Sequence, residues 1–386
     1  MHETADVIVV GGGIVGASIA CHLTSAGCRN VLILERETQP GTGSTGKSMG
    51  GVRAQFSLPA DIRMSLYSIS LFRDFEAQTG SPSGYRPEGY LFLATEPHHL
   101  EYLRANHARQ VAEGVRDVRL ISREEIVAMV PQLRCDDILG GSFCASDGFV
   151  DPHSVLTGFL KRAAERGARL VRETRVTGID VDAKGVAGVR TPHGSFASRT
   201  IINAAGAWAS EVAALAGVQL PVEPLRRMLV PTEPFDRISH SAPMTVDMST
   251  GFHFRPEGLG FLMAWNDPAE TPGFKLNVDR GFVEKILGLA ADRVPVFAEA
   301  QVNPSRAWAG LYEVSPDHHP ILGPVCGLPG FFLANGFSGH GVMHSPATGK
   351  ILADLVLKGA TDLIDIREFA LERFARGQFV EEMLVL

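Results

Sequence analysis

Asp6-Val-Ile-Val-Val-Gly-Gly-Gly-Ile-Val-Gly16 begins with a short apolar, β-branched run and continues directly into three consecutive glycines. Such a run is typical of a buried parallel strand. Residues 17–23 then carry apolar side chains at helical spacing, residues 31–34 form a second apolar run, and Glu35 follows it. We therefore predict a strand, a glycine turn, a helix and a second strand that ends in an acid, which is the order of a dinucleotide-binding βαβ unit.

The glycines of this unit have separate mechanical roles. Gly11 permits a tight turn, Gly13 lets a pyrophosphate approach the backbone, and Gly16 lets the helix pack closely on the strand. The start of the helix, at Ile14 and Val15, presents backbone N–H groups and a partial positive charge to phosphates.

The acid at the end of the second strand has the position of a ribose ligand. Glu35 lies 19 residues past Gly16 (35 − 16 = 19), where a carboxylate accepts hydrogen bonds from ribose hydroxyls. The same acid disfavours NADP, because it would repel the additional phosphate. A glycine-rich turn without a ligand is the alternative, and the complete order of strand, helix, strand and acid argues against it.

Length and composition limit the classes of function. The 386 residues suggest roughly two or three domains with ample core. The formal net charge is −7 and the basic residues are scattered, which argues against a nucleic-acid partner. The five cysteines include no C-x-x-C pair, as expected for reduced thiols in a cytoplasmic protein. No apolar run reaches the roughly 18 residues that a membrane span needs.

The rest of the chain alternates between patterns of both kinds. Residues 36–53 are rich in glycine and hydroxyl side chains; their position after the ribose acid favours a loop that lines a cofactor over a flexible linker. Helical patterns occupy residues 62–75, 100–113 and 152–166, and residues 200–206 form a buried strand that ends in small residues. The order suggests that one parallel sheet receives widely separated segments.

Residues 221–309 have a different character. They are rich in proline and aromatic residues, and strand-like pieces occur at 227–232, 251–255, 260–264 and 297–303. We predict an antiparallel sheet that lies over the first domain. A strand at 330–335 then leads into Gly336-Phe-Ser-Gly-His-Gly341, and a helix is expected to begin at Pro346 and continue to Leu357.

Several separated stretches together resemble the flavoproteins of the D-amino acid oxidase / sarcosine oxidase superfamily. They are VIVVGGGIVGASIACHL, GTGSTGKSMGGVR, IINAAGAWA, FHFRPEGLG and GLYEVSPDHHPILGP with FFLANGFSGHGVMHSPATGK, so the resemblance covers nearly the whole chain. Within the superfamily the pattern is most similar to the β subunits of heteromeric sarcosine oxidases and proline dehydrogenases. Partner subunits of a heteromeric flavoenzyme are therefore among the partners that the resemblance implies.

The resemblance implies FAD as the cofactor and an α/β fold. A Rossmann-type FAD-binding domain, glutathione-reductase-like, would combine residues 1–85, 150–220 and 310–386. A second, substrate domain built on an antiparallel sheet would combine residues 86–149 and 221–309. The helix expected near Ser345 would direct its positive end at the flavin.

The resemblance also assigns the cofactor contacts residue by residue. They fall on the glycine turn, the ribose acid, the loop that follows, the adenine contact, the small residues after the buried strand, and the closing glycine loop. The expected positions are Gly11, Gly13, Ile14, Val15, Gly16, Glu35, Arg36, Ser44, Thr45, Lys47, Ser48, Met49, Val176, Ala205, Gly206, Gly310, Gly336, Ser338, Gly339, His340, Gly341, Val342 and Met343.

Two arginines and two histidines are the candidate catalytic residues. Arg53 aligns with the family's arginine that binds a substrate carboxylate, for which a planar guanidinium is well suited; an arginine paired with a structural acid is the alternative. Arg255 is a second candidate. His340 is expected near the flavin or substrate, as a hydrogen-bond partner, a base or a structural residue, and His253 faces the substrate if the strand register permits.

No metal site is predicted. His340 and His344 have the spacing of a metal pair on a helix, but Gly339 and Gly341 argue against a helix there and no third ligand is near in sequence.

Three departures from the family pattern affect the expected chemistry. Leu262 stands where monomeric sarcosine oxidases carry an oxygen-activating lysine, Gly310 where their flavin-linking cysteine stands, and Met343 where their second carboxylate-binding lysine stands. A missing cation beside the flavin favours a dehydrogenase over a fast oxidase.

The sequence therefore predicts FAD-dependent oxidation of an amino acid or N-alkyl amino acid, such as sarcosine, proline or glycine, by hydride transfer to flavin N5. A flavoprotein 2-hydroxyacid dehydrogenase is one alternative. A non-catalytic flavin-binding subunit of an electron-transfer complex is another. The segment 379–386 is partly apolar, as expected for a segment that docks on a partner subunit.

Overall fold

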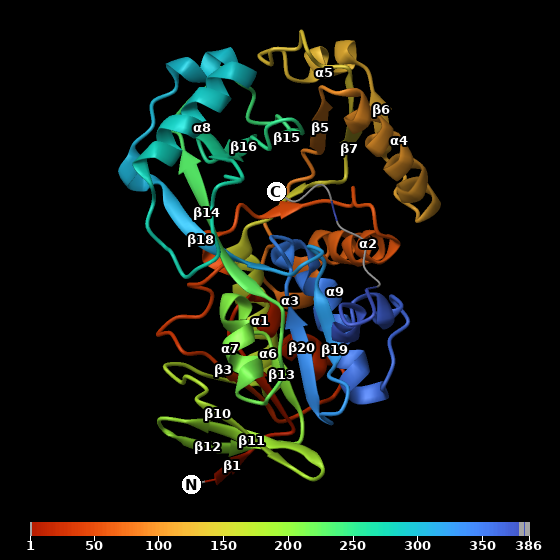
Figure 1. The fold of residues 1–386 in the computed structure, drawn as a ribbon, viewed down its shortest axis with the longest axis vertical. Helices are drawn as coiled ribbons and strands as arrows, with labels where there is room; N and C mark the ends of the chain where they lie inside the picture. The colour runs from red at the N-terminus through yellow and green to blue at the C-terminus, as the bar shows by residue number, and fades with distance from the viewer. Residues whose placement is uncertain (1, 378–381, 383–386) are drawn as a thin grey trace.

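The computed structural model describes residues 2–377 and residue 382 (Figure 1). Its elements form three layers along the long axis of the molecule. A small sheet lies at the N-terminal end, a parallel sheet with helices lies in the middle, and a large sheet lies at the opposite end (Figure 1).

The middle layer is a six-stranded sheet in the order β19-β20-β13-β2-β3-β9. Five strands run parallel, and β19 pairs antiparallel at the edge. The strands are β2 (Val7–Val10), β3 (Val31–Leu34), β9 (Arg169–Val171), β13 (Ile201–Asn203), β19 (Ile321–Pro324) and β20 (Phe331–Asn335). The predicted βαβ unit is confirmed, and segments from both ends of the chain join one sheet.

Both faces of this sheet are buried at β2 and β3, which explains why these two strands are continuously apolar. Val7 and Val9 face a core shared with α1 (Ile14–Ser25), α6 (Pro152–Glu165) and α9 (Gly341–Lys358). Ile8 and Val10 face a second core, shared with α7 (Ala209–Ala214) and the small sheet. The small sheet has the order β1-β12-β11-β10, formed by β1 (His2–Thr4), β10 (Gly178–Asp182), β11 (Gly185–Thr191) and β12 (Gly194–Ala197).

The third layer is an eight-stranded sheet in the order β18-β14-β17-β16-β15-β5-β7-β6. All pairs are antiparallel except β5 with β15, which are parallel. The strands are β5 (Tyr90–Ala94), β6 (Val118–Ile121), β7 (Gly140–Cys144), β14 (Glu223–Pro231), β15 (Met244–Asp247), β16 (His253–Glu257), β17 (Gly260–Ala264) and β18 (Trp308–Val314). The predicted antiparallel sheet is therefore present, with one parallel pair that the sequence did not reveal.

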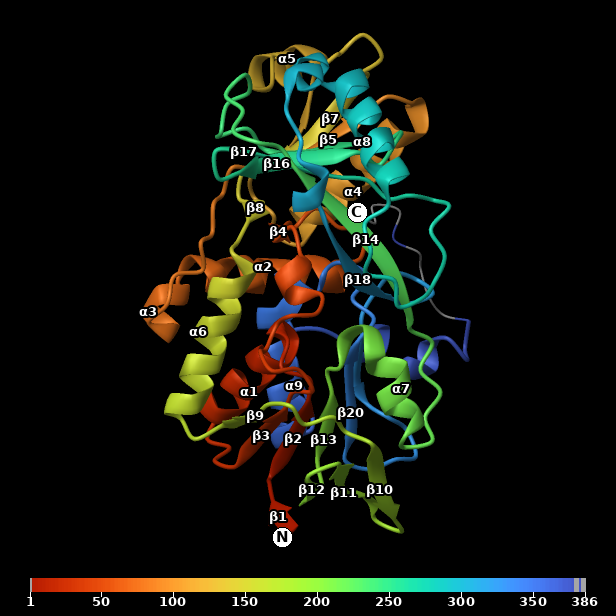
Figure 2. The ribbon, with the colours of Figure 1, turned by 90° about the vertical axis from the view of Figure 1, so that its left-hand side faces the viewer.

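The remaining elements cover these sheets or connect them. α4, α5 and α8 lie around the large sheet, and Figure 2 shows β14 and β18 running from it toward α7. The remaining bounds are α2 (Pro59–Arg73), α3 (Phe75–Thr79), α4 (Pro97–Ala112), α5 (Arg123–Met129), α8 (Arg280–Arg293), β4 (Gly51–Val52) paired with β8 (Gly148–Phe149), and the 3₁₀ turns η1 (Thr45–Lys47), η2 (Gly206–Trp208), η3 (Pro295–Glu299), η4 (Pro304–Arg306), η5 (Ile366–Glu368) and η6 (Leu371–Arg373). The domain boundaries stay a prediction; β18 spans the expected boundary at residue 310 and pairs along its length with β14.

Two predicted elements are wrong. Residues 297–303 are not a strand: η3 starts at Pro295, and only Val302 forms an isolated bridge, to Thr232. The last helix starts at Gly341 rather than at Pro346. Pro346, in the second turn of this helix, has no N–H to donate to the Val342 carbonyl. The Ser345 hydroxyl donates to this carbonyl at 2.9 Å instead, which explains why proline is tolerated there.

Two further observations concern membranes and the tail. Among the described helices, none is long and apolar enough to cross a membrane. The segment 379–386, apart from residue 382, lies outside the described residues.

Candidate active site

A cavity of about 810 Å³ lies between the middle sheet and the large sheet. Its floor includes Val10, Leu34 and Ala204, at or just beyond the carboxyl ends of β2, β3 and β13. Its other walls come from β14, β16, β17 and β18 of the large sheet. Open α/β sheets bind ligands at the carboxyl ends of their strands, so the cavity occupies the place where the sequence predicts a cofactor.

Glu35 marks one end of the cavity and is held in a fixed orientation. One carboxylate oxygen accepts the Gly12 N–H at 2.8 Å, and the other accepts the Glu37 N–H at 2.9 Å. Gly11 has a φ of +115°, and a Cβ there would lie 2.3 Å from the Ala204 oxygen. A Cβ at Gly16 would lie 2.0 Å from the Gly11 oxygen. The glycine roles predicted at these two positions are confirmed, because no larger side chain fits at either.

A three-layer stack stands next to Glu35. The Arg36 guanidinium lies 3.5 Å over the centre of the Trp208 ring, and the Phe274 ring stacks on Trp208 with centres 5.3 Å apart. Phe274 belongs to the connection between β17 and α8, residues 265–279, which contains no helix or strand. We call this connection the 265–279 segment. Leu276 and Val278 of this segment line the cavity. The stack therefore connects the 265–279 segment to the ribose end of the cavity.

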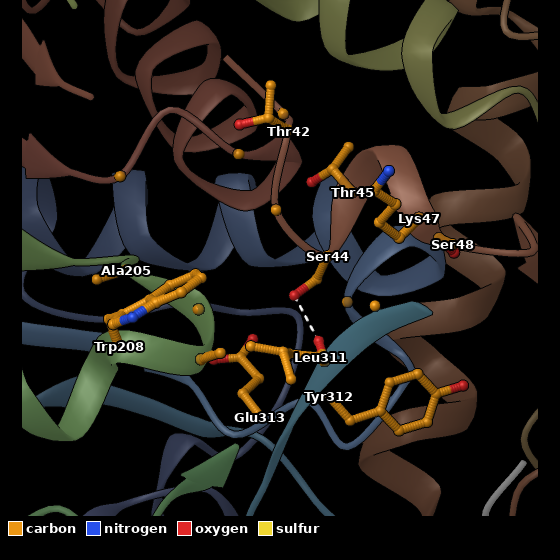
Figure 3. Close-up of a pocket in the computed structure, with 18 of the residues that line it drawn as sticks. Thr42, Ser44, Thr45, Lys47, Ser48, Ala205, Trp208, Leu311, Tyr312 and Glu313 are labelled. Atoms are coloured by element: carbon orange, nitrogen blue, oxygen red, sulfur yellow. Dashed lines mark hydrogen bonds between the residues drawn. The ribbon is translucent and has the colours of Figure 1, made fainter. Parts of the chain in front are cut away.

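The predicted loop lines the middle of the cavity with Ser44, Thr45, Lys47, Ser48 and Met49. The Ser44 hydroxyl donates to the Leu311 carbonyl at 2.6 Å, as Figure 3 shows. A Cβ at Gly310 would lie 2.6 Å from the Cβ of Lys47. The loop and β18 are thus in direct contact, and glycine at 310 is what allows it.

The closing glycine loop contributes only part of its predicted contacts. Gly339, Gly341 and Val342 line the cavity at the N-terminal end of α9. Five other predicted positions are not among the lining residues: Gly336, Ser338, His340, Met343 and, at the glycine turn, Gly16. The other predicted cofactor positions line the cavity: Gly11, Gly13, Ile14, Val15, Glu35, Arg36, Val176, Ala205, Gly206 and Gly310.

The end opposite Glu35 carries Arg227, His253 and Tyr312. The Arg227 guanidinium lies 5.2 Å from the centre of the Tyr312 ring, and its buried Nε has no hydrogen-bond partner among the described residues. Burial lowers the pKa of Arg227 and raises that of Tyr312. Burial, with Arg227 nearby, also lowers the pKa of His253 to about 4. His253 Nδ1 donates to the Gly251 carbonyl at 2.9 Å, which leaves Nε2 as the acceptor nitrogen of a neutral ring.

Two predicted catalytic arginines lie outside the lining. Arg53 is fully buried, stacks 3.8 Å over the Phe56 ring, and lies 3.3 Å from His340 Nε2 through its Nη2. Arg255 donates to the Met49 carbonyl at 2.7 Å and pairs with Glu257. Arg255 thus supports the cofactor loop from behind.

His344 belongs to a buried polar cluster in which α9 faces α2, and His340 lies one turn before it. His344 Nε2 lies 3.0 Å from the Ser65 hydroxyl, and its Nδ1 lies 3.8 Å from Asp61, which pairs with His319 at 2.6 Å. The expectation that no helix forms here is wrong for His344, which lies inside α9, while His340 is its N-cap. Among the described residues, no group of three or more His, Cys, Asp or Glu could hold a metal ion.

Comparison with known proteins agrees with this geometry. The model of the family described as "FAD dependent oxidoreductase" matches residues 6–355. The chain belongs to this family. It is 32% identical to FAD-dependent oxidoreductase domain-containing protein 1 of Xenopus laevis, over 96% of this chain and 83% of that one.

Two further FAD-dependent oxidoreductase relatives have more specific names. Human mitochondrial sarcosine dehydrogenase is 30% identical over 96% of this chain, which spans only 42% of that protein. The crystal structure of L-proline dehydrogenase from P. horikoshii superposes with a TM-score of 0.91 at 30% identity, covering 98% of this chain and 100% of that one. The predicted family and α/β fold are confirmed.

FAD is the cofactor of this oxidoreductase, and the residues present fit it. The cavity has a volume within the usual range for ligand sites. A held carboxylate lies at one end, and only glycine fits the turn beneath it. FAD in extended form would place its ribose at Glu35 and its flavin toward β18 and the start of α9.

Sequence reasoning missed several lining residues, notably Arg227, Trp208, Tyr312 and Glu313. Arg226 and Arg227 are adjacent on β14, and no local pattern distinguishes them. Arg226 pairs with Glu270 at 2.6 Å, whereas Arg227 turns to the cavity. Only the alternation of a strand whose register is known could have identified the second of the two.

Proposed function

We propose that this FAD-dependent oxidoreductase oxidises the C–N bond of an amino acid or N-alkyl amino acid of the sarcosine, proline or glycine type. The observation that carries the proposal is Arg227, a partly buried cation in the cavity wall whose shielded Nε lacks a hydrogen-bond partner among the described residues. An arginine with an unused N–H donor matches an α-carboxylate, which it can bind through two parallel hydrogen bonds. The names of the sarcosine and proline dehydrogenases to which the chain is similar support the same substrate class.

The chain's residues would divide the work between them. Arg227 would bind the carboxylate and fix the substrate's orientation, with Tyr312 beside it. His253 would orient the substrate amine by accepting a hydrogen bond at Nε2. Burial lowers the pKa of His253 to about 4, so the ring stays neutral and keeps this acceptor nitrogen. Bound FAD supplies the hydride acceptor at flavin N5.

Arg53 remains a proposal as a carboxylate ligand, but the structure gives it a weaker basis than Arg227. Its guanidinium contacts Phe56 and His340, behind the cavity lining. The observed positions favour Arg227 as the clamp and Arg53 as support for the N-terminal end of α9.

A dehydrogenase is favoured over a fast oxidase. Leu262, in the place of the oxygen-activating lysine, is buried and packs with Leu229 and Ala264 of the cavity wall. An apolar side chain there provides no charge to stabilise reduced oxygen. Partner subunits and a cytoplasmic location stay predictions.

The first experiment mixes the holoenzyme anaerobically with sarcosine, proline, glycine, D-amino acids and 2-hydroxyacids and follows the absorbance of oxidised flavin. We expect an amino acid to bleach it and air to restore the colour slowly. Reduction by a hydroxyacid instead would favour the 2-hydroxyacid alternative. Bound flavin that no substrate reduces would favour the non-catalytic alternative.

The second experiment tests Arg227 itself. Arg227→Met should raise the KM for the amino acid by about 100-fold, because two charge-assisted hydrogen bonds are lost, while the FAD content stays unchanged. Arg237→Met is the matched control, because Arg237 is an exposed arginine of the same layer that pairs with Glu299. A wild-type KM in Arg227→Met would contradict the proposed clamp.

A further inference from the structure

Glu313 is an acid in the wall of the cofactor cavity that neither the sequence analysis nor the proposed reaction uses. It lies on β18, two residues after Leu311, whose carbonyl accepts the Ser44 hydroxyl. Figure 3 shows Glu313 on the Trp208 and Ala205 side of Leu311. Its own carbonyl accepts the Ser338 N–H at 3.0 Å, which ties it to the loop before α9.

The carboxyl group of Glu313 is only partly satisfied. The backbone N–H groups of Gly336 and Phe337 partly oppose the effect of burial on its pKa, while Oε2 is shielded from solvent and has no hydrogen-bond partner among the described residues. No described lysine, arginine or histidine forms an ion pair with it. Burial raises the pKa of Glu313 to about 8.

A buried carboxyl oxygen without a hydrogen-bond partner is unfavourable in a cavity wall, because the oxygen has left water without gaining a new partner. The position of Oε2 is explained if the ligand of this cavity carries a group that forms a hydrogen bond with it.

The order of the groups along FAD limits which part of the cofactor reaches Glu313. The adenosine ribose belongs to Glu35 at the far end, and the pyrophosphate belongs to the glycine turn at the start of α1. Between Glu35 and the start of α9, where Glu313 lies, the extended cofactor would place its ribityl chain. The hydroxyls of that chain are the donors expected in this part of the cavity.

We propose that the Glu313 carboxyl group binds a hydroxyl of the ribityl chain of FAD. Glu313 thus serves cofactor retention rather than the oxidation step. The assignment rests on FAD as the cofactor and is independent of which amino acid is the substrate.

Calorimetric titration of the apoprotein with FAD and with ADP tests this assignment. ADP carries the adenosine and the pyrophosphate but lacks the ribityl chain. Glu313→Ala should raise the Kd for FAD about tenfold and leave the Kd for ADP unchanged. Glu313→Gln, which keeps a hydrogen-bonding group at the same place, should stay within about threefold of the wild type for FAD. Glu35→Ala is the matched control and should weaken both ligands.

Two outcomes would overturn the proposal. An unchanged Kd for FAD in Glu313→Ala would show that no hydroxyl is held there. An equal loss of FAD and ADP affinity would show that Glu313 shapes the whole cavity instead.

Infrared difference spectra of the wild type keep the test independent of whether Glu313→Ala folds. Addition of FAD should shift the carboxyl C=O band, and the shift should be absent in Glu313→Gln. No shift in the wild type would contradict the proposal.

Discussion

Three histidines near the cavity, His253, His340 and His344, are buried, and burial disfavours their protonated form. Burial lowers the pKa of His253 and of His344 to about 4, although Asp61 acts in the opposite direction on His344. Burial, with Arg53 nearby, also lowers the pKa of His340. The folded protein keeps these rings neutral, whereas the unfolded chain protonates them near pH 6.5.

The sign of the resulting pH dependence follows directly. The unfolded state binds more protons than the folded state once the pH falls below 6.5, so stability is lost as the pH falls toward 4. From pH 7 to pH 5, His344 alone should lower the free energy of unfolding by about 2 kcal/mol. Urea titrations at pH 7 and pH 5 should therefore show that His344→Gln loses about 2 kcal/mol less unfolding free energy than the wild type over this interval.

The exposed His193 provides the matched control, and His193→Gln should keep the wild-type slope. The same loss in His344→Gln as in the wild type would mean that His344 is already protonated in the folded protein. His319 acts in the opposite direction: although burial lowers its pKa, Asp61 raises it above the usual value, so its contribution is present at acidic pH and lost as the pH rises.

The contact between η1 and β18 at the cavity is closely packed. Any side chain at Gly310 would lie 2.6 Å from the Lys47 Cβ. Gly310→Ala should therefore lower the free energy of unfolding by about 1–3 kcal/mol through overpacking. Thermal unfolding of the double variant Gly310→Ala with Lys47→Gly should recover most of this loss, since the clashing atom is absent. Equal melting temperatures for the single and double variants would show that the strain lies elsewhere.

The 265–279 segment is held by an aromatic contact with Trp208 and by several polar contacts, among them the bond from the Arg226 guanidinium to the Asn277 carbonyl at 2.7 Å. Glu270 pairs with Arg226, and the Gly273 N–H donates to the Pro224 carbonyl at 2.8 Å. Phe274, although half exposed, stacks on Trp208. Polar contacts lie on both sides of Phe274, at Gly273 and Asn277, so the stacking on Trp208 can be removed by substitution while the backbone of the segment stays anchored.

Phe274→Ala should accelerate exchange of bound FAD with labelled FAD by about three- to tenfold, because an aromatic pair contributes roughly 0.5–1.5 kcal/mol. Leu259→Ala is the matched control: Leu259 is the most exposed large apolar residue described, and it does not line the cavity. Unchanged exchange in Phe274→Ala would show that FAD leaves by another route.

Elements with local signals could be predicted from the sequence. Ser122 and Glu125 form a capping box at the start of α5, which their spacing in the sequence is sufficient to predict. The opening βαβ unit follows from apolar runs and glycines that are adjacent in sequence. The start of α9 could not be predicted in this way. Proline at position 346 is typical of a helix start. The hydrogen bond from the Ser345 hydroxyl to the Val342 carbonyl, which only the structure shows, explains why the helix can begin five residues earlier, at Gly341.

The whole cavity depends on both large sheets. Val10 and Ala204 come from the middle sheet, whereas Arg227, His253 and Leu311 come from the eight-stranded sheet. A ligand that contacts both walls stabilises both layers together. At a concentration 100 times its Kd, FAD should add about 2.7 kcal/mol to the free energy of unfolding.

Hydrogen exchange should show this stabilisation in β13 and in β18 alike when FAD is added. ADP, which reaches only the ribose and pyrophosphate end, should protect β13 and leave β18 unchanged. Protection confined to the middle sheet with FAD would contradict a cofactor that spans both walls.

The two ends of the site differ in how far the sequence could predict them. The ribose end is built from residues 11–35, so its glycines and Glu35 are identified by spacing alone. The substrate end combines β14, β16 and β18, whose register depends on pairings between residues distant in sequence. His253 could be proposed but not oriented, and Arg227 could not be separated from Arg226, because a one-residue change of register exchanges the two faces.

All three tryptophans of the chain, Trp208, Trp265 and Trp308, line the cofactor cavity. The tryptophan fluorescence of the protein therefore originates entirely at the site. Oxidised flavin absorbs where indole emits, so the loaded protein should be nearly dark in the ultraviolet and should brighten as the cofactor leaves. The chain thus carries its own optical sensor of cofactor loading, which requires no label and no turnover.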